Sequence, residues 1–175
     1  ALLRWLVVGG LTGLVCGLAG GAFSYVLAWV TQTREAYPWL LFFMPIAGLL
    51  IVWSYQTLDM ANDSGTNQII ASVRSGEKPR LRLALLIFFG AALTHLTGGS
   101  AGREGAALQI GGSLAATLGK RLRLDERNMN LIVLCGMSAL FTALFGTPVA
   151  ATVFSMEVVS VGILHYSALF PGLFA

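Results

Sequence analysis

The chain has 175 residues, of which 56% are hydrophobic and 11% are charged, and its mean hydropathy is +0.77. This apolar share exceeds that of an ordinary soluble domain, so the composition argues against a soluble enzyme or binding module and indicates a membrane protein. The formal net charge of +3 is carried by two short basic segments, RSGEKPRLR at 74–82 and KRLRLDER at 120–127. The positive-inside rule accounts for such segments, so we expect no nucleic-acid partner.

Four uncharged apolar runs are long enough to cross a bilayer, which needs about 20 residues. They cover residues 5–30, 38–58, 83–102 and 128–156. Because apolar runs continue along the whole chain, we interpret the first as a structural helix and not as a secretory signal. The sequence therefore predicts an all-α, polytopic membrane protein with no soluble domain.

The first expected helix runs from about Leu3 to Thr31 and is ended by the polar stretch TQTREAYP. A second span is expected from Pro38, a favoured first-turn residue, to near Asp59. The stretch that follows, MANDSGTNQIIASVRSG, is too polar at its start and too short for a full crossing. Six glycines of the first helix predict a small-residue face for close helix packing: Gly9, Gly10, Gly13, Gly17, Gly20 and Gly21.

Further spans are expected at 81–97, 128–145 and 148–163, and the final HYSALFPGLFA has the character of the start of another helix. A shorter segment, 103–119, opens on a charged pair. If both basic segments are cytoplasmic, 81–97 leaves the cytoplasmic side and 103–119 returns to it. The irregular link GGSAGREG then lies inside the membrane, which is tolerated only where backbone is buried in protein or lines an aqueous cavity. We expect the functional site at this link.

The link has the chemistry of an anion site. Its glycines at positions 98, 99, 102 and 105 allow the backbone to turn and approach a ligand, and the helix beginning near Arg103 directs its N–H groups and positive dipole end at the link. Glu104 would lie where the anion binds, so its carboxylate could replace the anion and leave on protonation, which would couple proton and anion movement. Alternatively, Glu104 stabilises the helix N-terminus, with Arg103 as its counter-ion. Within a membrane segment, the functional interpretation of an ionisable pair is the default.

A second, weaker copy of this arrangement occurs at NDSGTNQII. There Ser64 and Gly65 precede a short apolar segment and could present a hydroxyl and N–H groups to an anion. Short hydrophobic segments whose N-termini point to one place are typical of a transporter's binding site.

The sequence gives weaker support for two other classes of function, a hydrolase and a protein that binds a metal or a cofactor. GGSAG fits G-x-S-x-G and would make Ser100 the nucleophile of a hydrolase, with His95 or His165 as its base. No strand–turn–helix pattern surrounds it, so we expect no enzyme activity. Cys16 and Cys135 lie in apolar runs and show no metal-ligand spacing, and no phosphate-binding loop occurs, so no cofactor and no metal are expected.

These motifs resemble the CLC family of chloride channels and anion/proton exchangers over almost the whole chain. GREGAALQIGG is similar to the family's GREGP motif and the helix after it, DSGTN to its GSGIP motif, and LFGTPVAATVFSMEV to a later segment. The resemblance implies that Glu104 is the gating glutamate and that the backbone of Arg103, Gly105 and Ala106 forms part of the anion site. It places Ser64 at the anion-coordinating serine. Glu157 matches a glutamate of the later helix, for which structural and functional roles both stay open.

The sequence departs from the chloride-type pattern at several positions. Ala106 replaces the proline of GREGP, and Thr66 and Asn67 replace the isoleucine and proline of GSGIP. Val158 lies where many chloride/proton exchangers have their inner proton-carrying glutamate. These departures resemble the bacterial fluoride/proton antiporter branch, in which an asparagine tends to replace the anion-site serine. Asn62 and Asn67 therefore compete with Ser64 for the anion-coordinating role.

The resemblance implies a multi-pass protein of the bacterial inner or plasma membrane that exports fluoride in exchange for protons. A chloride/proton exchanger or a passive chloride channel of the same family is the alternative, and a purely structural membrane subunit is a third. The family builds each pathway from two inverted halves with broken and re-entrant helices. We therefore expect residues 1–175 to be the amino-terminal half of such a transport domain, without its second inverted repeat. Either the chain is a fragment of a longer protein, which we favour, or it associates with a partner that completes the pathway. The resemblance also implies a homodimer.

Overall fold

The computed structural model describes residues 2–60, 65–75, 79–159 and 168–175, and every regular element within these ranges is a helix. This confirms the all-α prediction. The elements are α1 (Leu2–Ala36), the 3-10 helix η1 (Pro38–Phe43), α2 (Met44–Thr57), α3 (Thr66–Ser75), α4 (Leu81–Leu96), α5 (Arg103–Arg121), α6 (Glu126–Phe145), α7 (Pro148–Val159) and α8 (Leu169–Phe174).

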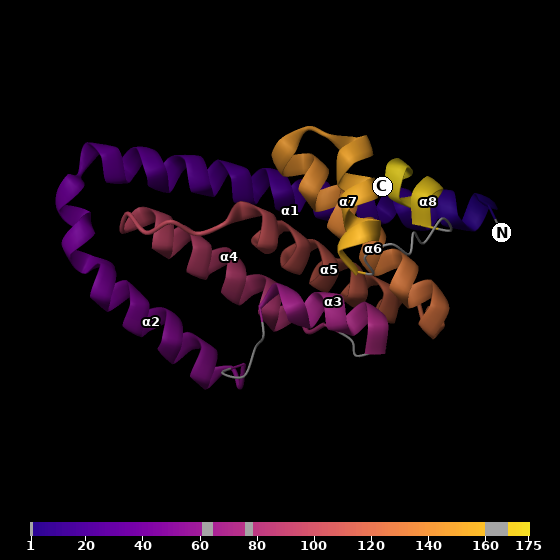
Figure 1. Ribbon diagram of the computed structural model, residues 1–175, viewed down its shortest axis with the longest axis horizontal. Coiled ribbons are helices and arrows are strands. Elements are labelled where there is room, and N and C mark those ends of the chain that lie inside the picture. Colours follow the sequence, from indigo (N-terminus) through magenta and orange to yellow (C-terminus); the bar gives the residue numbers. More distant parts are fainter. Residues whose placement is uncertain (1, 61–64, 76–78, 160–167) are drawn as a thin grey trace.

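The helices form a layered bundle in which α1 runs along one long side (Figure 1). The chain turns at η1, and α2 returns at a splayed angle, so that α4 lies between α1 and α2. Among the described residues, three stretches are long and apolar enough to cross a membrane: Trp5–Ala36, Pro38–Thr57 and Asn128–Phe145. The apolar helices α4 and α7 are shorter. Both findings fit the predicted multi-pass architecture.

Helix α1 is longer than the sequence predicted, because the polar stretch TQTREA stays helical. The hydroxyls of Thr31 and Thr33 donate to the carbonyl oxygens of Leu27 and Trp29, at 2.7 and 2.8 Å, so these side chains satisfy themselves on the helix. The helix ends at Ala36, two residues before Pro38, since a proline disfavours helical backbone in the residue that precedes it, here Tyr37. The expected end at Thr31 was therefore wrong by five residues.

The remaining boundaries agree with the sequence to within a few residues. The expected second span opens with one 3-10 segment before α2, and Pro38 and Pro45 stand at the two helix starts. The polar, short segment after α2 contains the ten-residue α3, as expected. The end of the expected span 148–163 lies outside the described residues.

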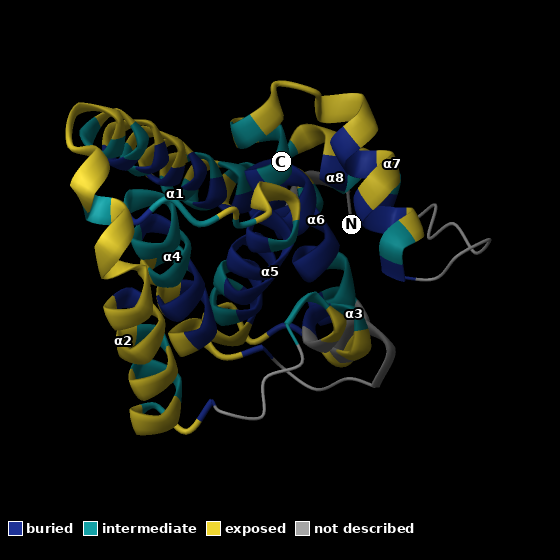
Figure 2. Ribbon diagram, turned by 60° about the vertical axis from the view of Figure 1, so that its left-hand side comes forward, coloured by how far each residue is buried: buried dark blue, intermediate teal, exposed yellow. Residues whose placement is uncertain are grey.

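Helix α5 is the centre of the fold. Most of its residues from Ala106 to Gly119 are buried, and Figure 2 shows it as the dark, buried element between the neighbouring helices. A Cβ added at Gly136 of α6 would overlap the Ala115 side chain, and one added at Gly111 would overlap the Gly136 backbone. The backbones of α5 and α6 thus touch at their crossing, which is the small-residue packing typical of membrane helices.

The small-residue face predicted for α1 is only partly present. A Cβ at Gly20 would come within 2.7 Å of the Ala143 Cβ, and Gly9, Gly10 and Gly13 face the end of α8. Added Cβ atoms at Gly17 and Gly21, in contrast, meet nothing within 4 Å among the described residues. Helix α2 is exposed where α5 is buried: Ala47 is its one buried residue, and Figure 2 shows it as a mostly exposed ribbon at the edge of the bundle.

Candidate functional site

The N-termini of α3 and α5 meet beside the glycine-rich link. Gln109 Nε2 on α5 donates a hydrogen bond to Thr66 Oγ1, the first residue of α3, at 3.2 Å. A Cβ at Gly105 would come within 2.8 Å of the same Thr66 oxygen, so only a glycine permits this approach. Because helix N-termini carry unpaired N–H groups and the positive end of the helix dipole, their convergence favours a bound anion.

A cavity of about 480 Å³ lies at this convergence, and we call it the helix-end pocket. It is open on one side and has helices α2 and α4 as its outer walls. Its described lining residues are Ile51, Tyr55, Gly65, Thr66, Ile87, Gly90, Ala91, Thr94, Ala101, Gly102, Gly105, Ala106 and Gln109. None of these side chains is ionisable except that of Tyr55, so any bound anion would be held by helix ends and neutral donors.

Of the residues that the sequence proposed for the site, Gly65, Gly105 and Ala106 line the helix-end pocket. Asn67 is exposed in the first turn of α3 and is not among the lining residues. Ser64 and Asn62 lie outside the described residues. The anion-coordinating role of Ser64, Asn62 or Asn67 therefore stays a prediction from the sequence.

Arg103 and Glu104 form the first turn of α5 and are both exposed. Glu104 stands in sequence between the lining residues Gly102 and Gly105, yet its side chain is not part of the pocket wall. Within the described residues, one ion pair is formed, between Arg34 and Glu35 at 3.6 Å, and it does not involve Glu104. The Glu104 carboxylate is thus not held by Arg103 as a counter-ion.

The structure also places in the site two residues that the sequence analysis did not propose for it, Thr66 as a lining residue and Gln109 as its hydrogen-bond partner. Gln109 is 8% exposed, although it is a polar residue in an apolar stretch. The sequence could have predicted that Gln109 faces the site, because Gln109 follows Gly105 by one helical turn and so lies on the same face of α5. What the sequence could not supply is the contact with α3.

The positions of Ser100 and His95 do not support the hydrolase hypothesis. His95 Nδ1 donates to the Ala91 carbonyl oxygen at 2.8 Å, one turn back along α4, so the ring is engaged within its own helix. Ser100 is exposed in the link, and His165 lies outside the described residues. The hydrogen bond of His95 within α4 is the structural role that a histidine in a helix bundle most often has.

Helix α7 carries the two remaining sequence positions of interest. Glu157 is exposed there, and the half-buried Val158 packs against the hydrophobic core. No ionisable group therefore stands at position 158.

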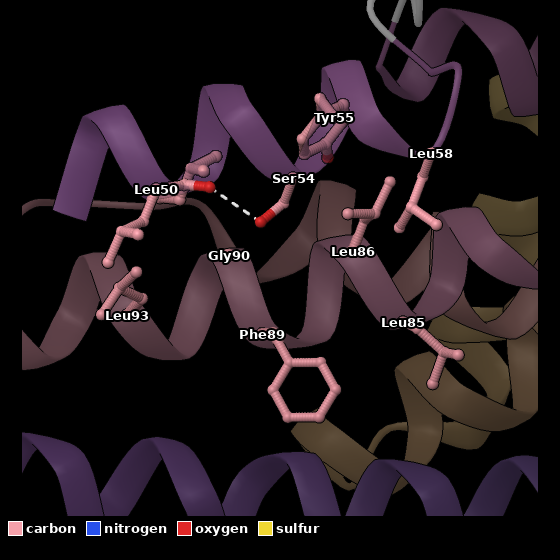
Figure 3. Close-up of a pocket in the computed structure, with 10 residues that line it drawn as sticks. Leu50, Ser54, Tyr55, Leu58, Leu85, Leu86, Phe89, Gly90 and Leu93 are labelled. Carbon is pink, nitrogen blue, oxygen red and sulfur yellow. Dashed lines mark hydrogen bonds between the residues drawn. The ribbon is translucent and has the colours of Figure 1, made fainter.

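A second cavity, of about 380 Å³, lies between α2 and α4 and is almost wholly apolar. Figure 3 shows Leu50 and Leu93 facing each other across it, and the Ser54 hydroxyl donating to the Leu50 carbonyl oxygen at 2.7 Å. Because that hydrogen bond satisfies the Ser54 hydroxyl proton, the groove presents apolar walls. It adjoins the helix-end pocket through Ile51, Tyr55 and Gly90, but it lacks anion chemistry.

The link depends on a glycine at position 98, where the backbone has φ +85°. A Cβ at this position would also come within 2.9 Å of the Leu41 Cδ1 of η1. We expect Gly98→Ala to lower the free energy of unfolding by about 1–3 kcal/mol, the cost of forcing a side chain into a sparsely populated backbone region. The measurement is equilibrium unfolding in mixed micelles.

Gly102→Ala is the matched control for that prediction. Gly102 lies in the same link at φ −66°, and its added Cβ would make an ordinary 3.5 Å contact with Glu104 Oε2. Its effect should stay within about 0.5 kcal/mol. Equal destabilisation by the two substitutions would contradict the role assigned to the Gly98 backbone.

A sequence model of the family described as voltage gated chloride channel matches residues 47–175. The chain is 38% identical over 169 residues to the chloride/fluoride channel protein of Pseudomonas syringae pv. tomato, covering 96% of this chain and 37% of that protein. It is 30% identical over 167 residues to the H(+)/Cl(-) exchange transporter ClcA of Cronobacter sakazakii, covering 87% of this chain and 36% of that protein.

Among solved structures, the crystal structure of a CLC-type fluoride/proton antiporter resembles this chain with a TM-score of 0.91 at 35% sequence identity. The likeness covers 99% of this chain and 44% of that one. The chain thus spans less than half the length of the relatives it matches.

Proposed function

Since this chain belongs to the voltage-gated chloride channel family, also called CLC, whose members are anion transporters or channels and not enzymes, we propose that it forms one half of a fluoride/proton antiporter. In this proposal residues 1–175 are the amino-terminal half of the transport domain, and a second inverted repeat completes the pathway. The complete protein is a homodimer, as is typical of the family, and it spans the bacterial cell membrane several times.

The observation that carries the proposal is the convergence of the α3 and α5 N-termini on one pocket inside an apolar bundle. Helix ends attract an anion without placing a fixed positive charge in the membrane. A site made of partial charges binds an anion less tightly than an ion pair would, so the anion can also leave. The neutral lining of the pocket therefore favours transport over permanent binding.

Glu104 supplies the proton coupling in this proposal. Its position at the start of α5 allows the carboxylate to occupy the anion's place at the helix end when ionised, since the helix dipole favours either negative group. Protonation removes the charge and with it the attraction to the helix end. Anion entry and Glu104 protonation would then go together, and each transport cycle would move a proton.

Fluoride is favoured as the substrate because two relatives named for it match the chain over nearly its whole length, at 38% and 35% identity. Fluoride is also a small, strong hydrogen-bond acceptor, so it benefits from a site rich in donors. The chloride/proton exchanger that matches at 30% identity supports the alternative, a chloride exchanger or chloride channel on the same scaffold.

The test is ion flux from liposomes that contain the complete protein. We expect fluoride efflux down its gradient to drive measurable proton uptake, with chloride efflux at least tenfold slower. A fluoride electrode, a chloride electrode and a pH electrode record the three fluxes on the same preparation. Chloride efflux as fast as fluoride efflux would contradict the fluoride assignment, and fluoride efflux without proton uptake would contradict antiport.

A further inference from the structure

Gln109 is the most buried polar side chain that lines the helix-end pocket, with 8% of its surface exposed. Its Nε2 donates to Thr66 Oγ1, whereas its Oε1 is buried and has no hydrogen-bond partner among the described residues. A buried amide oxygen without a partner is rare in folded proteins and calls for a specific explanation. Since Gln109 lines a cavity, a bound species inside that cavity is the direct one.

The hydrogen bond between Gln109 and Thr66 also fixes how the Thr66 hydroxyl is used. A hydroxyl offers one proton and two acceptor lone pairs. Because the Gln109 N–H occupies one lone pair, the Thr66 proton is not used in this hydrogen bond and remains available to a third group. Thr66 lines the helix-end pocket at the first position of α3, so its hydroxyl can add a donor to the N–H groups of the two helix ends.

Thr94 shows the contrasting case in the same pocket. Its hydroxyl donates to the Gly90 carbonyl oxygen at 2.7 Å, so its proton is consumed within α4. Thr31 and Thr33 make the same kind of bond to their own helix. Thr66, at a helix start, is paired by a side chain from another helix instead, and that pairing comes from 43 residues away in the sequence.

We propose that Thr66 is a specificity-determining anion ligand and that Gln109 is the residue that positions it. The inference deepens the proposed function and rests on it. Fluoride accepts hydrogen bonds more strongly than chloride, so an oriented hydroxyl donor at the helix ends favours fluoride. Gln109 Oε1 accepts a hydrogen bond from a water molecule that accompanies the anion, which accounts for its lack of a protein partner.

The experiment compares variants of the complete protein in liposomes by the ratio of the initial fluoride and chloride efflux rates. Thr66→Val keeps the shape of the side chain and removes the hydroxyl. We expect it to lower this ratio about tenfold, the loss of one hydrogen bond to a charged acceptor, mainly through a higher half-saturation concentration for fluoride. Thr66→Ser keeps the hydroxyl and should stay within about twofold of the unmodified protein. Thr31→Val makes the same change in α1, outside the pocket, and should leave the ratio unchanged.

Gln109→Met tests the positioning role. It should lower the fluoride/chloride ratio in the same direction as Thr66→Val, with chloride efflux retained as evidence of a folded protein. The double variant should be no worse than Thr66→Val alone, because both substitutions remove the same oriented hydroxyl. A second measurement is the rise in melting temperature on adding sodium fluoride in detergent, which should shrink in both variants.

The results separate this inference from the proposed function. If the unmodified protein exports fluoride with protons but Thr66→Val keeps the unmodified selectivity, the role of Thr66 is overturned and the proposed function stands. An equal fall in Thr31→Val would overturn it too, because the effect would then not be specific to a hydroxyl in the helix-end pocket. If the unmodified protein shows no fluoride-selective flux, the proposed function and this inference are both overturned.

Discussion

Replacing Glu104 by glutamine is expected to abolish proton uptake while anion efflux continues. Glutamine keeps the size and hydrogen-bonding shape of the protonated glutamic acid, but it cannot ionise. If Glu104 exchanges with the anion at the start of α5, its neutral form leaves the helix end open to the anion and carries no proton. We expect coupled proton uptake to fall at least tenfold, below detection in the liposome assay, with fluoride efflux retained.

Glu126→Gln is the matched control for this experiment. Glu126 is also an exposed acidic residue in the first turn of a helix, α6, but it lies far along the chain from the helix-end pocket. If Glu104 only stabilised its helix through the dipole, both substitutions would cost about 0.3–1 kcal/mol of stability and neither would alter coupling. Proton uptake that survives Glu104→Gln would refute the gating role and leave this structural one.

Gly136→Val is expected to have the largest effect on stability. The added side chain would occupy the space of the Ala115 side chain and of the Gly111 backbone, at the crossing where α5 and α6 touch. Backbone on both sides of the contact cannot move aside as a flexible side chain can. We expect the free energy of unfolding to fall by about 3 kcal/mol, the upper part of the range for an overpacked core, measured by unfolding in mixed micelles.

Gly21→Val on α1 provides the comparison for this packing prediction. An added Cβ at Gly21 meets nothing within 4 Å among the described residues, and the position is exposed. The substitution should change stability by less than about 1 kcal/mol, since only the helix propensity of the residue changes. If both valines were equally harmful, the damage would not come from the crossing of α5 and α6.

The site could be predicted in part from local sequence. GREG at the start of a helix and a short helix after DSGTN were both visible in the chain, and the structure brings those two helix starts together at the helix-end pocket. Three of the proposed site positions, Gly65, Gly105 and Ala106, line that pocket. Glu104 was expected within the anion site; its side chain is exposed and is not among the residues that line the pocket. Its gating role stays a prediction for Glu104→Gln to test.

The sequence by itself determined that the protein is helical, where most helices lie, and that an irregular glycine-rich link precedes α5. These features follow from composition, apolar run length and the backbone needs of glycine and proline, which are properties of neighbouring residues. The sequence nevertheless predicted the end of α1 five residues too early. Its polar residues suggested a break, whereas the threonine hydroxyls form hydrogen bonds with carbonyl oxygens of the same helix.

Only the tertiary structure decided which residues share a site. It made α5 the buried centre of the bundle, although α5 is less apolar than α4 and α6, because Gly111 and Gly136 let two backbones touch. It also paired Gln109 with Thr66, which are separated by 43 residues. The physical reason is that periodicity places a side chain on a face of its own helix, whereas the partner on that face depends on how the helices pack.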